Sequence, residues 1–238
     1  MLHMILLECA LELVPPELSA LKQIQKNASK RGKKTTEILL DQSHHGRAMT
    51  RLEDGLQRGR PDIVFHSLMS ILETPLCKSG NLTVHLHLQD GRIVELNPEV
   101  RLPRNYDRFV GLFEQLLTKG QVPVEGDPLL KITTNKLSNL LTELKKGVSE
   151  SQTILTIENG SKTSISALQS QFSSDLSVPI IVGVGAFPHG DFSEGLKELF
   201  ETHVQLDKEV MMAWHVCAEI LWMYSASVGI IEQRYSAT

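Results

Sequence analysis

The sequence predicts an α/β fold in which a parallel sheet is flanked by helices and carries an inserted β-hairpin. Short apolar runs alternate along the chain with segments of helical periodicity, an arrangement typical of such a sheet. Hydrophobic residues make up 41% of the 238 residues, enough for a substantial core. Near residues 81–96, apolar and polar residues alternate instead around a tight turn. We therefore assign residues 1–238 to a single domain with a hairpin insertion at that stretch.

Four short apolar runs are the expected strands of the parallel sheet. Met4 to Leu7 and Glu37 to Leu40 have the composition of buried strands. Thr153 to Ile157 and Val178 to Val184 are similar runs later in the chain. Since the segments between these runs favour helices, the strands are expected to lie parallel.

The hairpin and two helical segments complete the predicted architecture. Asn81 to Leu88 alternates as a strand, Gln89-Asp90-Gly91 supplies the turn, and Arg92 to Leu96 forms the return strand. A helical pattern follows Asp41, and the segment Met211 to Ile230 is expected to be the helix that closes the fold. The apolar positions of the helical pattern after Asp41 are Met49, Leu52 and Leu56.

An arginine-rich segment lies where a strand is expected to give way to a helix. Arg101, Arg104 and Arg108 follow one another at spacings of three and four residues. If the chain is helical after Pro103, Arg104 and Arg108 share one face of the helix. A neighbouring apolar stripe would anchor that helix to the core: Phe109, Leu112, Phe113 and Leu116. Guanidinium groups fit phosphate oxygens, so the segment predicts an RNA site. The alternative is a solvated helix start with an Asp107–Arg108 charge pair.

The charge of the chain limits the kind of RNA site that is expected. The net charge of −4 argues against a protein that coats nucleic acid indiscriminately, so a site must be a local basic patch. From Lys22 to Lys34 there are six basic residues and no acidic one. This run is expected to be a loop, either in contact with backbone phosphate or, as is more common, simply solvated.

The cysteines and the amino terminus indicate the cellular compartment in which the protein is expected. Cys9, Cys77 and Cys217 are odd in number and far apart, which favours packing roles in a reducing compartment over disulfides or a zinc framework. The first residues lack the basic start and cleavage site of a signal peptide, and no apolar run approaches the ~20 residues of a membrane span. We expect a soluble, cytoplasmic protein with neither a membrane nor DNA as partner.

A glycine-framed turn follows the expected strand that ends at Val184. Gly185 and Gly190 bracket the segment Ala186-Phe187-Pro188-His189, and a helix is expected to begin near Ser193. Glycine lets the backbone come close to a ligand, and a helix start favours negative charge. The spacing matches neither a dinucleotide fingerprint nor a P-loop. From these residues alone, an ordinary strand-to-helix turn is the favoured alternative.

The sequence Arg60-Pro61-Asp62 can hold the guanidinium group of Arg60 in one orientation. Pro61 favours the first position of a helix, which places Asp62 in the first turn, close enough to hold Arg60.

A metal site is a competing hypothesis for the histidines. His85 and His87 share one face of the expected hairpin strand, while His44, His45 and Asp41 lie elsewhere in the sequence. No carboxylate-rich motif accompanies them, so we expect no metal. The sequence also lacks the G-x-S-x-G and H-E-x-x-H signatures of nucleophilic and zinc-dependent hydrolases.

The order of these motifs matches one known family over nearly the whole chain. The matching strings are Leu39-Leu40-Asp41, Arg60-Pro61-Asp62-Ile63, residues 73–80, residues 97–111, Gly185-Ala186-Phe187-Pro188-His189-Gly190 and Ala213-Trp214-His215-Val216-Cys217. In these features the chain resembles the ribosome-biogenesis pseudouridine N1-methyltransferases of the SPOUT, or trefoil-knot, class, in particular their archaeal branch.

The resemblance implies a fold, a reaction and a set of site residues. It implies a homodimeric SPOUT-type α/β trefoil knot that uses S-adenosylmethionine to methylate N1 of a pseudouridine in a loop of small-subunit ribosomal RNA. It places the RNA contacts on Arg60, Arg101, Arg104 and Arg108, with Asp62 fixing Arg60. The implied cofactor residues are Leu155, Gly185, Gly190, Leu206, Asp207, Lys208, Glu209, Val210 and Met211.

Catalytic roles are expected for Arg60 and Asp62. A cation near the base favours its deprotonated form, so Arg60 is a candidate for stabilising the transition state; Asp62 as the general base is a weaker hypothesis.

The sequence departs mildly from the family pattern at residues 73–80 and is more charged than many relatives at residues 207–210. Two alternatives remain: an RNA-binding assembly factor without catalysis, and a knot methyltransferase that acts on another base.

Overall fold

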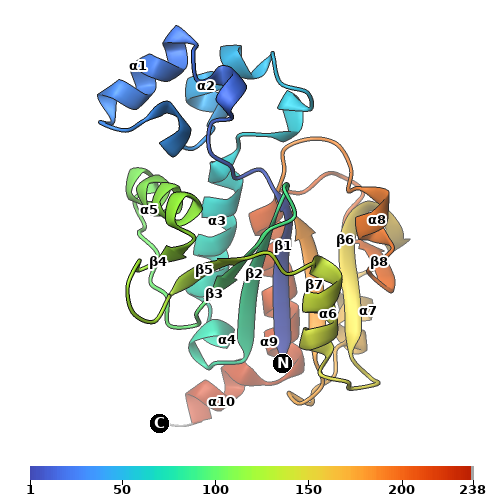
Figure 1. The fold of residues 1–238 in the computed structure, drawn as a ribbon. Helices are drawn as coiled ribbons and strands as arrows, with labels where there is room; N and C mark the ends of the chain where they lie inside the picture. The colour runs from blue at the N-terminus through green and yellow to red at the C-terminus, as the bar shows by residue number, and fades with distance from the viewer. Residues whose placement is uncertain (237–238) are drawn as a thin grey trace.

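In residues 1–236, which the computed structural model describes, eight strands form one mixed sheet with helices on both faces (Figure 1). The order across the sheet is β4-β5-β3-β2-β1-β7-β6-β8. The strands are β1 (Leu2–Cys9), β2 (Leu82–Leu88), β3 (Ile93–Leu96), β4 (Gln121–Val122), β5 (Leu130–Thr133), β6 (Gln152–Lys162), β7 (Ile180–Gly185) and β8 (Thr202–Gln205).

The parallel half of the sheet is built around β1. β1 pairs in parallel with β2 on one side and with β7 on the other, so that Leu6 lies between Leu86 and Val184. β7 and β8 both pair in parallel with β6. The carboxyl ends of these strands consequently meet at one edge of the sheet. Strands β3, β4 and β5 extend the other half with antiparallel pairs.

The helices divide between the two faces of the sheet. They are α1 (Lys22–Lys30), α2 (Gln42–Met49), α3 (Pro61–Leu72), α4 (Pro75–Lys78), α5 (Tyr106–Lys119), α6 (Leu137–Lys145), α7 (Ile165–Gln171), α8 (Glu194–Lys197), α9 (Ala213–Ser227) and α10 (Ile230–Ser236). Apolar residues of α3, α5 and α9 form the main core with one face of the sheet, and α6 and α8 cover the opposite face. None of the helices in the described part of the chain is both long and apolar enough to span a membrane.

Residues 14–58 form a small helical lobe beside the sheet, at the top of Figure 1. The lobe has a core of its own, in which Ile24 and Ala28 of α1 pack with Val14, Ile38 and Met49. Leu39 of the lobe packs into the main core instead, and polar contacts also attach the lobe to the body.

Glu114 of α5 makes several of these polar contacts. Its side chain is fully buried and accepts hydrogen bonds from the guanidinium of Arg31 (2.8 Å for the Nη2–Oε2 pair), from Nζ of Lys33 (2.7 Å) and from the backbone N–H of Leu39 (3.0 Å). A buried carboxylate is stable only when it is paired and hydrogen-bonded, and these three donors come from the lobe. Glu114 therefore ties the lobe to α5.

Most of the predicted elements are confirmed. The runs at residues 4–7, 153–157 and 178–184 lie in β1, β6 and β7, and the hairpin is β2 and β3, closed by Gly91 at φ +84°. The closing helix is α9, which ends at Ser227 before Gly229 (φ +64°) starts the separate helix α10. The assignment of the whole chain to a single domain stays a prediction.

Three local predictions in the lobe are wrong. Glu37 to Leu40 is not a strand of the sheet: Thr35–Glu37 is a 3-10 turn, and Leu39 makes one isolated antiparallel bridge to Leu13. The run from Lys22 to Lys34 is mostly the helix α1 rather than a loop, because its apolar positions have helical spacing. The helix after Asp41 ends at Met49, so Leu52 and Leu56 lie beyond it.

We predict that Glu114→Gln loosens the lobe. The neutral amide leaves Arg31 and Lys33 without their counter-charge, and we expect a loss of about 2–4 kcal/mol in the free energy of unfolding. Urea denaturation measures this loss, and hydrogen exchange should show faster exchange at residues 14–58 than at the sheet. Glu150→Gln, at an exposed position, is the matched control and should change stability by less than about 0.5 kcal/mol. Equal effects of the two substitutions would contradict the role given to Glu114.

Candidate active site at the carboxyl edge of the sheet

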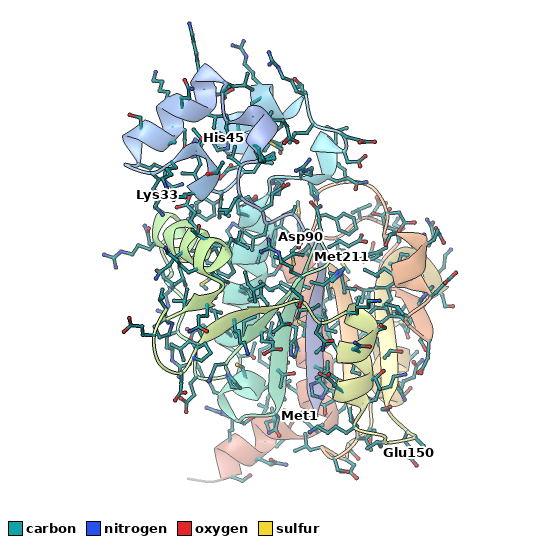
Figure 2. The ribbon with its side chains drawn as sticks, viewed as in Figure 1. Met1, Lys33, His45, Asp90, Glu150 and Met211 are labelled. Atoms are coloured by element: carbon teal, nitrogen blue, oxygen red, sulfur yellow. The ribbon has the colours of Figure 1, made fainter. Side chains whose placement is uncertain are left out.

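Three loops leave the same edge of the parallel sheet. Residues 157–160 bulge out of β6 between two sets of paired residues, residues 186–193 follow β7, and residues 206–212 follow β8. Met211 lies at the end of the sheet opposite Met1 (Figure 2). Ligands of open α/β sheets bind outside the carboxyl ends of the strands, so this edge is the expected location of a cofactor.

The loops after β7 and β8 suit an adenosine-containing cofactor. In the described chain, neither residues 187–190 nor residues 206–211 form an internal backbone–backbone hydrogen bond, and the Glu209 N–H donates to the side-chain carboxylate of Asp207 (2.8 Å). Free backbone donors and acceptors are therefore available to a purine ring and a ribose. Apolar surface is present as well, because Val210 is 74% exposed and Met212 62% exposed. These residues fit S-adenosylmethionine, the cofactor that the resemblance implies.

Both ends of the turn after β7 leave little room for a Cβ atom, which favours glycine there. A Cβ atom on Gly185 would lie 3.0 Å from the rings of Phe187 and Phe192, which pack edge to face. Gly190 has φ +93°, and a Cβ atom there would lie 2.4 Å from the side-chain amide of Gln57. Gln57 belongs to the lobe, so the lobe reaches over the end of this turn.

Leu155 lies apart from the other predicted cofactor residues. Its side chain is fully buried in the core beneath α6, and its backbone pairs with Gly183 and His203 in the middle of β6. The first partly exposed residue after Leu155 in this strand is Ile157, two positions later. Cofactor contact at Leu155 therefore stays a prediction, and the backbone of Leu155 or its immediate neighbours would have to make it.

Backbone hydrogen bonds join the glycine turn to Arg60. Ala186 donates to the carbonyl of Leu7 (2.9 Å), and its own carbonyl accepts from the N–H of Ala10 (2.9 Å). The carbonyl of Ala10 in turn accepts from the N–H of Arg60 (3.0 Å). Ala10 thus holds the predicted cofactor turn and the predicted catalytic arginine side by side.

Asp62 grips the guanidinium of Arg60 with both carboxylate oxygens. Nε and Nη2 of Arg60 each donate at 2.8 Å, and Pro61 occupies the start of α3 as expected. Partial burial alone would raise the pKa of Asp62, but the hydrogen bonds and charge of Arg60 outweigh it and hold the pKa below its usual value. The same hydrogen bonds raise the pKa of Arg60. The pair is therefore fully charged, and Arg60 has a fixed direction.

A second polar pair lies beside the first. Asp41, which caps α2 through the N–H of Ser43 (2.8 Å), accepts a hydrogen bond from the hydroxyl of Tyr106 (2.9 Å) at the start of α5. Burial and the charge of Asp41 raise the pKa of Tyr106 far above its usual value, so the hydroxyl keeps its proton. The N–H of Gln42, next to Asp41, donates to the carbonyl of Gly59, next to Arg60 (2.8 Å), so the two pairs are neighbours.

The other three arginines are exposed to solvent. Arg108 lies in the first turn of α5, whereas Arg104 precedes the helix, whose cap is Asn105, so these two do not share a helix face as expected. Arg104 is 80% exposed and makes one long contact with Glu73 (3.3 Å). Neither Arg101 nor Arg108 forms an ion pair within the described residues, and the alternative Asp107–Arg108 pair is therefore not formed there. The predicted apolar stripe is confirmed, with Phe109, Phe113 and Leu116 fully buried.

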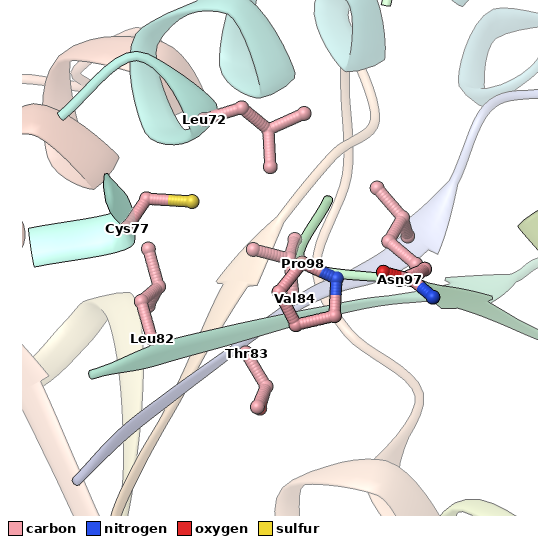
Figure 3. A pocket seen from close by; sticks show the side chains of 8 residues that line it. Leu72, Cys77, Leu82, Thr83, Val84, Asn97 and Pro98 are labelled. Atoms are coloured by element: carbon pink, nitrogen blue, oxygen red, sulfur yellow. The ribbon is translucent and has the colours of Figure 1, made fainter. Parts of the chain in front are cut away.

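Two hollows of the surface lie away from this edge of the sheet. Figure 3 shows a pocket of about 10 Å³ between Leu72, Cys77 and Asn97, which is far too small for a nucleoside. An open groove of about 620 Å³ near Lys145 and Glu201 lies at the amino ends of β6 and β8, the opposite edge of the sheet. No group of three histidine, cysteine or carboxylate side chains suited to a metal occurs among residues 1–236.

Comparison with known proteins identifies the family. The model of the family described as EMG1/NEP1 methyltransferase matches residues 4–225. The chain belongs to this family. The chain is 40% identical over 227 residues to the ribosomal RNA small subunit methyltransferase Nep1 of Staphylothermus marinus, covering 92% of this chain and 93% of that one. It is 39% identical to the Nep1 of Thermococcus sibiricus, with coverages of 96% and 99%.

A solved structure of the same family has the same fold. The crystal structure of Archaeoglobus fulgidus Nep1 bound to S-adenosylhomocysteine superposes with a TM-score of 0.81 at 34% identity, covering 94% of this chain and 97% of that one. The SPOUT-type α/β fold predicted for this EMG1/NEP1 family member is therefore confirmed.

Sequence reasoning missed several residues that shape the edge of this EMG1/NEP1 fold. Tyr106 lay within the recognised arginine segment, yet only the contact with Asp41 reveals its position. Glu8 has a left-handed backbone (φ 47°) and accepts a hydrogen bond from the hydroxyl of Ser193 (2.8 Å), which holds the far end of the glycine turn. Trp214 packs on His66 of α3 at 5.1 Å, which ties the start of α9 to the helix of Arg60. None of these contacts has a spacing signal in the sequence.

Proposed function

We propose that this protein transfers the methyl group of S-adenosylmethionine to N1 of a pseudouridine in a loop of small-subunit ribosomal RNA. The observation that carries the proposal is the chain of backbone hydrogen bonds from Ala186 through Ala10 to Arg60, which joins a cofactor-type turn to an aimed arginine. The names of the relatives support ribosomal RNA as the substrate. S-adenosylhomocysteine in the related structure is the product that S-adenosylmethionine leaves after methyl transfer, and it supports the choice of cofactor.

The loops at the edge of the sheet would hold the cofactor. Gly185, Gly190 and the segment Leu206 to Met211 surround the free backbone groups described above. S-adenosylmethionine supplies a methyl group on a sulfonium sulfur, which is already activated toward a nucleophile aligned with it. The protein is therefore required mainly to bring the base into line.

Arg60 would position the target base. Its guanidinium is held by Asp62 beside the glycine turn, and a fixed cation at that place also favours loss of the N1 proton as negative charge develops on the base. The exposed Arg101, Arg104 and Arg108 would bind the RNA backbone. Loops are the favoured substrate because an unpaired base leaves its stack at lower cost.

Asp62 is better suited to positioning than to proton transfer. Both of its oxygens already accept hydrogen bonds from Arg60, and a carboxylate with a lowered pKa is a weak base near neutral pH. A role as general base would require at least one free oxygen facing the substrate. We therefore assign Asp62 a positioning role, and Arg60 the direct contact.

The proposed function requires pseudouridine as the base that accepts the methyl group. Two synthetic RNA loops that differ only in carrying pseudouridine or uridine at one position should give different results in a transfer assay with labelled S-adenosylmethionine. We expect label only in the pseudouridine loop, because uridine has a carbon where pseudouridine has N1. Binding of both loops without transfer would instead support a non-catalytic assembly factor. Transfer to uridine, or to another base of both loops, would indicate a different target.

Asp62→Asn tests the positioning role. The amide no longer holds the guanidinium with two charged hydrogen bonds, and displacement of an aligned group typically costs about 100-fold in kcat/KM. We expect RNA affinity and methyl transfer to fall together. Loss of transfer with unchanged RNA affinity would show that Asp62 is the base after all. Glu201→Gln breaks the Lys145–Glu201 pair at the opposite edge and should leave both measurements unchanged.

We also propose that the protein acts as a cytoplasmic homodimer. Trp222 on α9 is 57% exposed, and Val210 and Met212 expose further apolar surface just before that helix. Large exposed apolar side chains are typical of a protein–protein interface. Light scattering should give twice the 26.5 kDa chain mass, and Trp222→Glu should shift the protein toward that monomer mass. A monomer mass for the unmodified protein at micromolar concentration would contradict the dimer.

A further inference from the structure

The lobe and the body of the protein carry opposite charges. Residues 15–58 contain nine lysines and arginines against five aspartates and glutamates, a net charge of +4. The rest of the chain has fifteen against twenty-three, a net charge of −8. The overall value of −4 therefore hides a basic lobe on an acidic body. Charge asymmetry of this kind indicates a surface for a polyanion.

Three lysines of the lobe form a row on α1. Lys22, Lys26 and Lys30 are spaced by four residues, so they follow one another along one side of the helix. All three are exposed, and none forms an ion pair or a side-chain hydrogen bond in the part of the chain that the structure describes. Since α1 contains no acidic residue, no charge within the helix neutralises the row.

The orientation of this row is fixed by the rest of the lobe. Ile24 and Ala28, on the opposite side of α1, are buried in the core of the lobe. Arg31 and Lys33, just after the helix, are bound to Glu114 of the body. The lysines therefore point outward from a fixed support. The apolar face of α1 is already buried, so it is unavailable for insertion into a membrane surface, and the row favours a soluble polyanion.

The row is connected to the proposed RNA site through α5. Glu114 joins the end of α1 to the middle of α5, and the Asp41–Tyr106 hydrogen bond joins the start of α2 to the start of α5, where Arg104 and Arg108 lie. The lobe stands above α5 and the start of α3 in Figure 1. An RNA bound at the arginines can therefore continue onto the lobe.

We propose that α1 is a second docking surface for the RNA substrate, which binds the phosphate backbone of the stem next to the methylated loop through Lys22, Lys26 and Lys30. This inference rests on the proposed function and extends it to the size of the substrate. Lysine ammonium groups bind phosphate as point charges, without regard to base sequence. The arginines at the edge of the sheet select the loop, and the lysine row adds affinity for the duplex beside it.

The test compares two RNAs and one triple variant. One RNA is the pseudouridine loop with a stem of about ten base pairs, and the other is the loop as a short single strand. For Lys22→Gln, Lys26→Gln and Lys30→Gln together, we expect the logarithmic salt slope for the stem RNA to become shallower by about 2.7, since each phosphate contact contributes about 0.9. Affinity for the stem RNA should fall at least about tenfold more than affinity for the short loop.

Two matched variants keep the test decisive. Lys131→Gln, Lys136→Gln and Lys162→Gln remove the same charge from exposed positions of the body and should leave the slope unchanged. The triple Lys→Arg variant of α1 keeps the charge and should bind like the unmodified protein. An unchanged slope in the α1 variant, or an equal change in the body variant, would overturn the proposal. Failure of the unmodified protein to methylate either RNA would instead overturn the proposed function.

Discussion

The backbone of Ala10 is the point on which the arrangement of the site depends. Its N–H and carbonyl bridge the turn after β7 and the first residue before α3, at the place where the central strand β1 ends. Backbone hydrogen bonds in a buried sheet edge are costly to leave unmade, so the two segments have little freedom to separate. The sheet itself therefore sets the distance between the cofactor turn and Arg60. Side-chain contacts set the direction of the Arg60 guanidinium but not its position.

Charge has two separate uses in this molecule. The buried Glu114 and the half-buried Asp62 each hold a cation in one direction, so the fold itself fixes the attachment of the lobe and the direction of Arg60. At the surface, lysines and arginines remain unpaired or weakly paired. Residues of one continuous basic run serve both purposes: Arg31 and Lys33 are bound to Glu114, whereas their neighbours on α1 are free to meet solvent or a ligand.

The sequence predicted the parts of the fold that local patterns determine. Apolar runs located β1, β6 and β7, and the alternation around Gly91 located the hairpin. Local patterns failed in the lobe, where the apolar run at residues 37–40 does not join the sheet: Ile38 and Leu40 pack into the core of the lobe, and Leu39 packs into the main core. The Arg60–Asp62 pair followed from spacing alone. The partners of Glu114 and Tyr106 lie 65 to 83 residues away in the chain, so no spacing rule could reveal them.

The separation of charge between lobe and body gives the whole molecule an electric dipole. In the field of a large polyanion, such a molecule experiences a torque that turns its positive end forward before any contact is made. The acidic body is at the same time repelled, so collisions in the wrong orientation become rarer. Alignment before contact raises the rate of productive encounters, and dissolved ions set the range over which it acts, roughly 8 Å at physiological ionic strength.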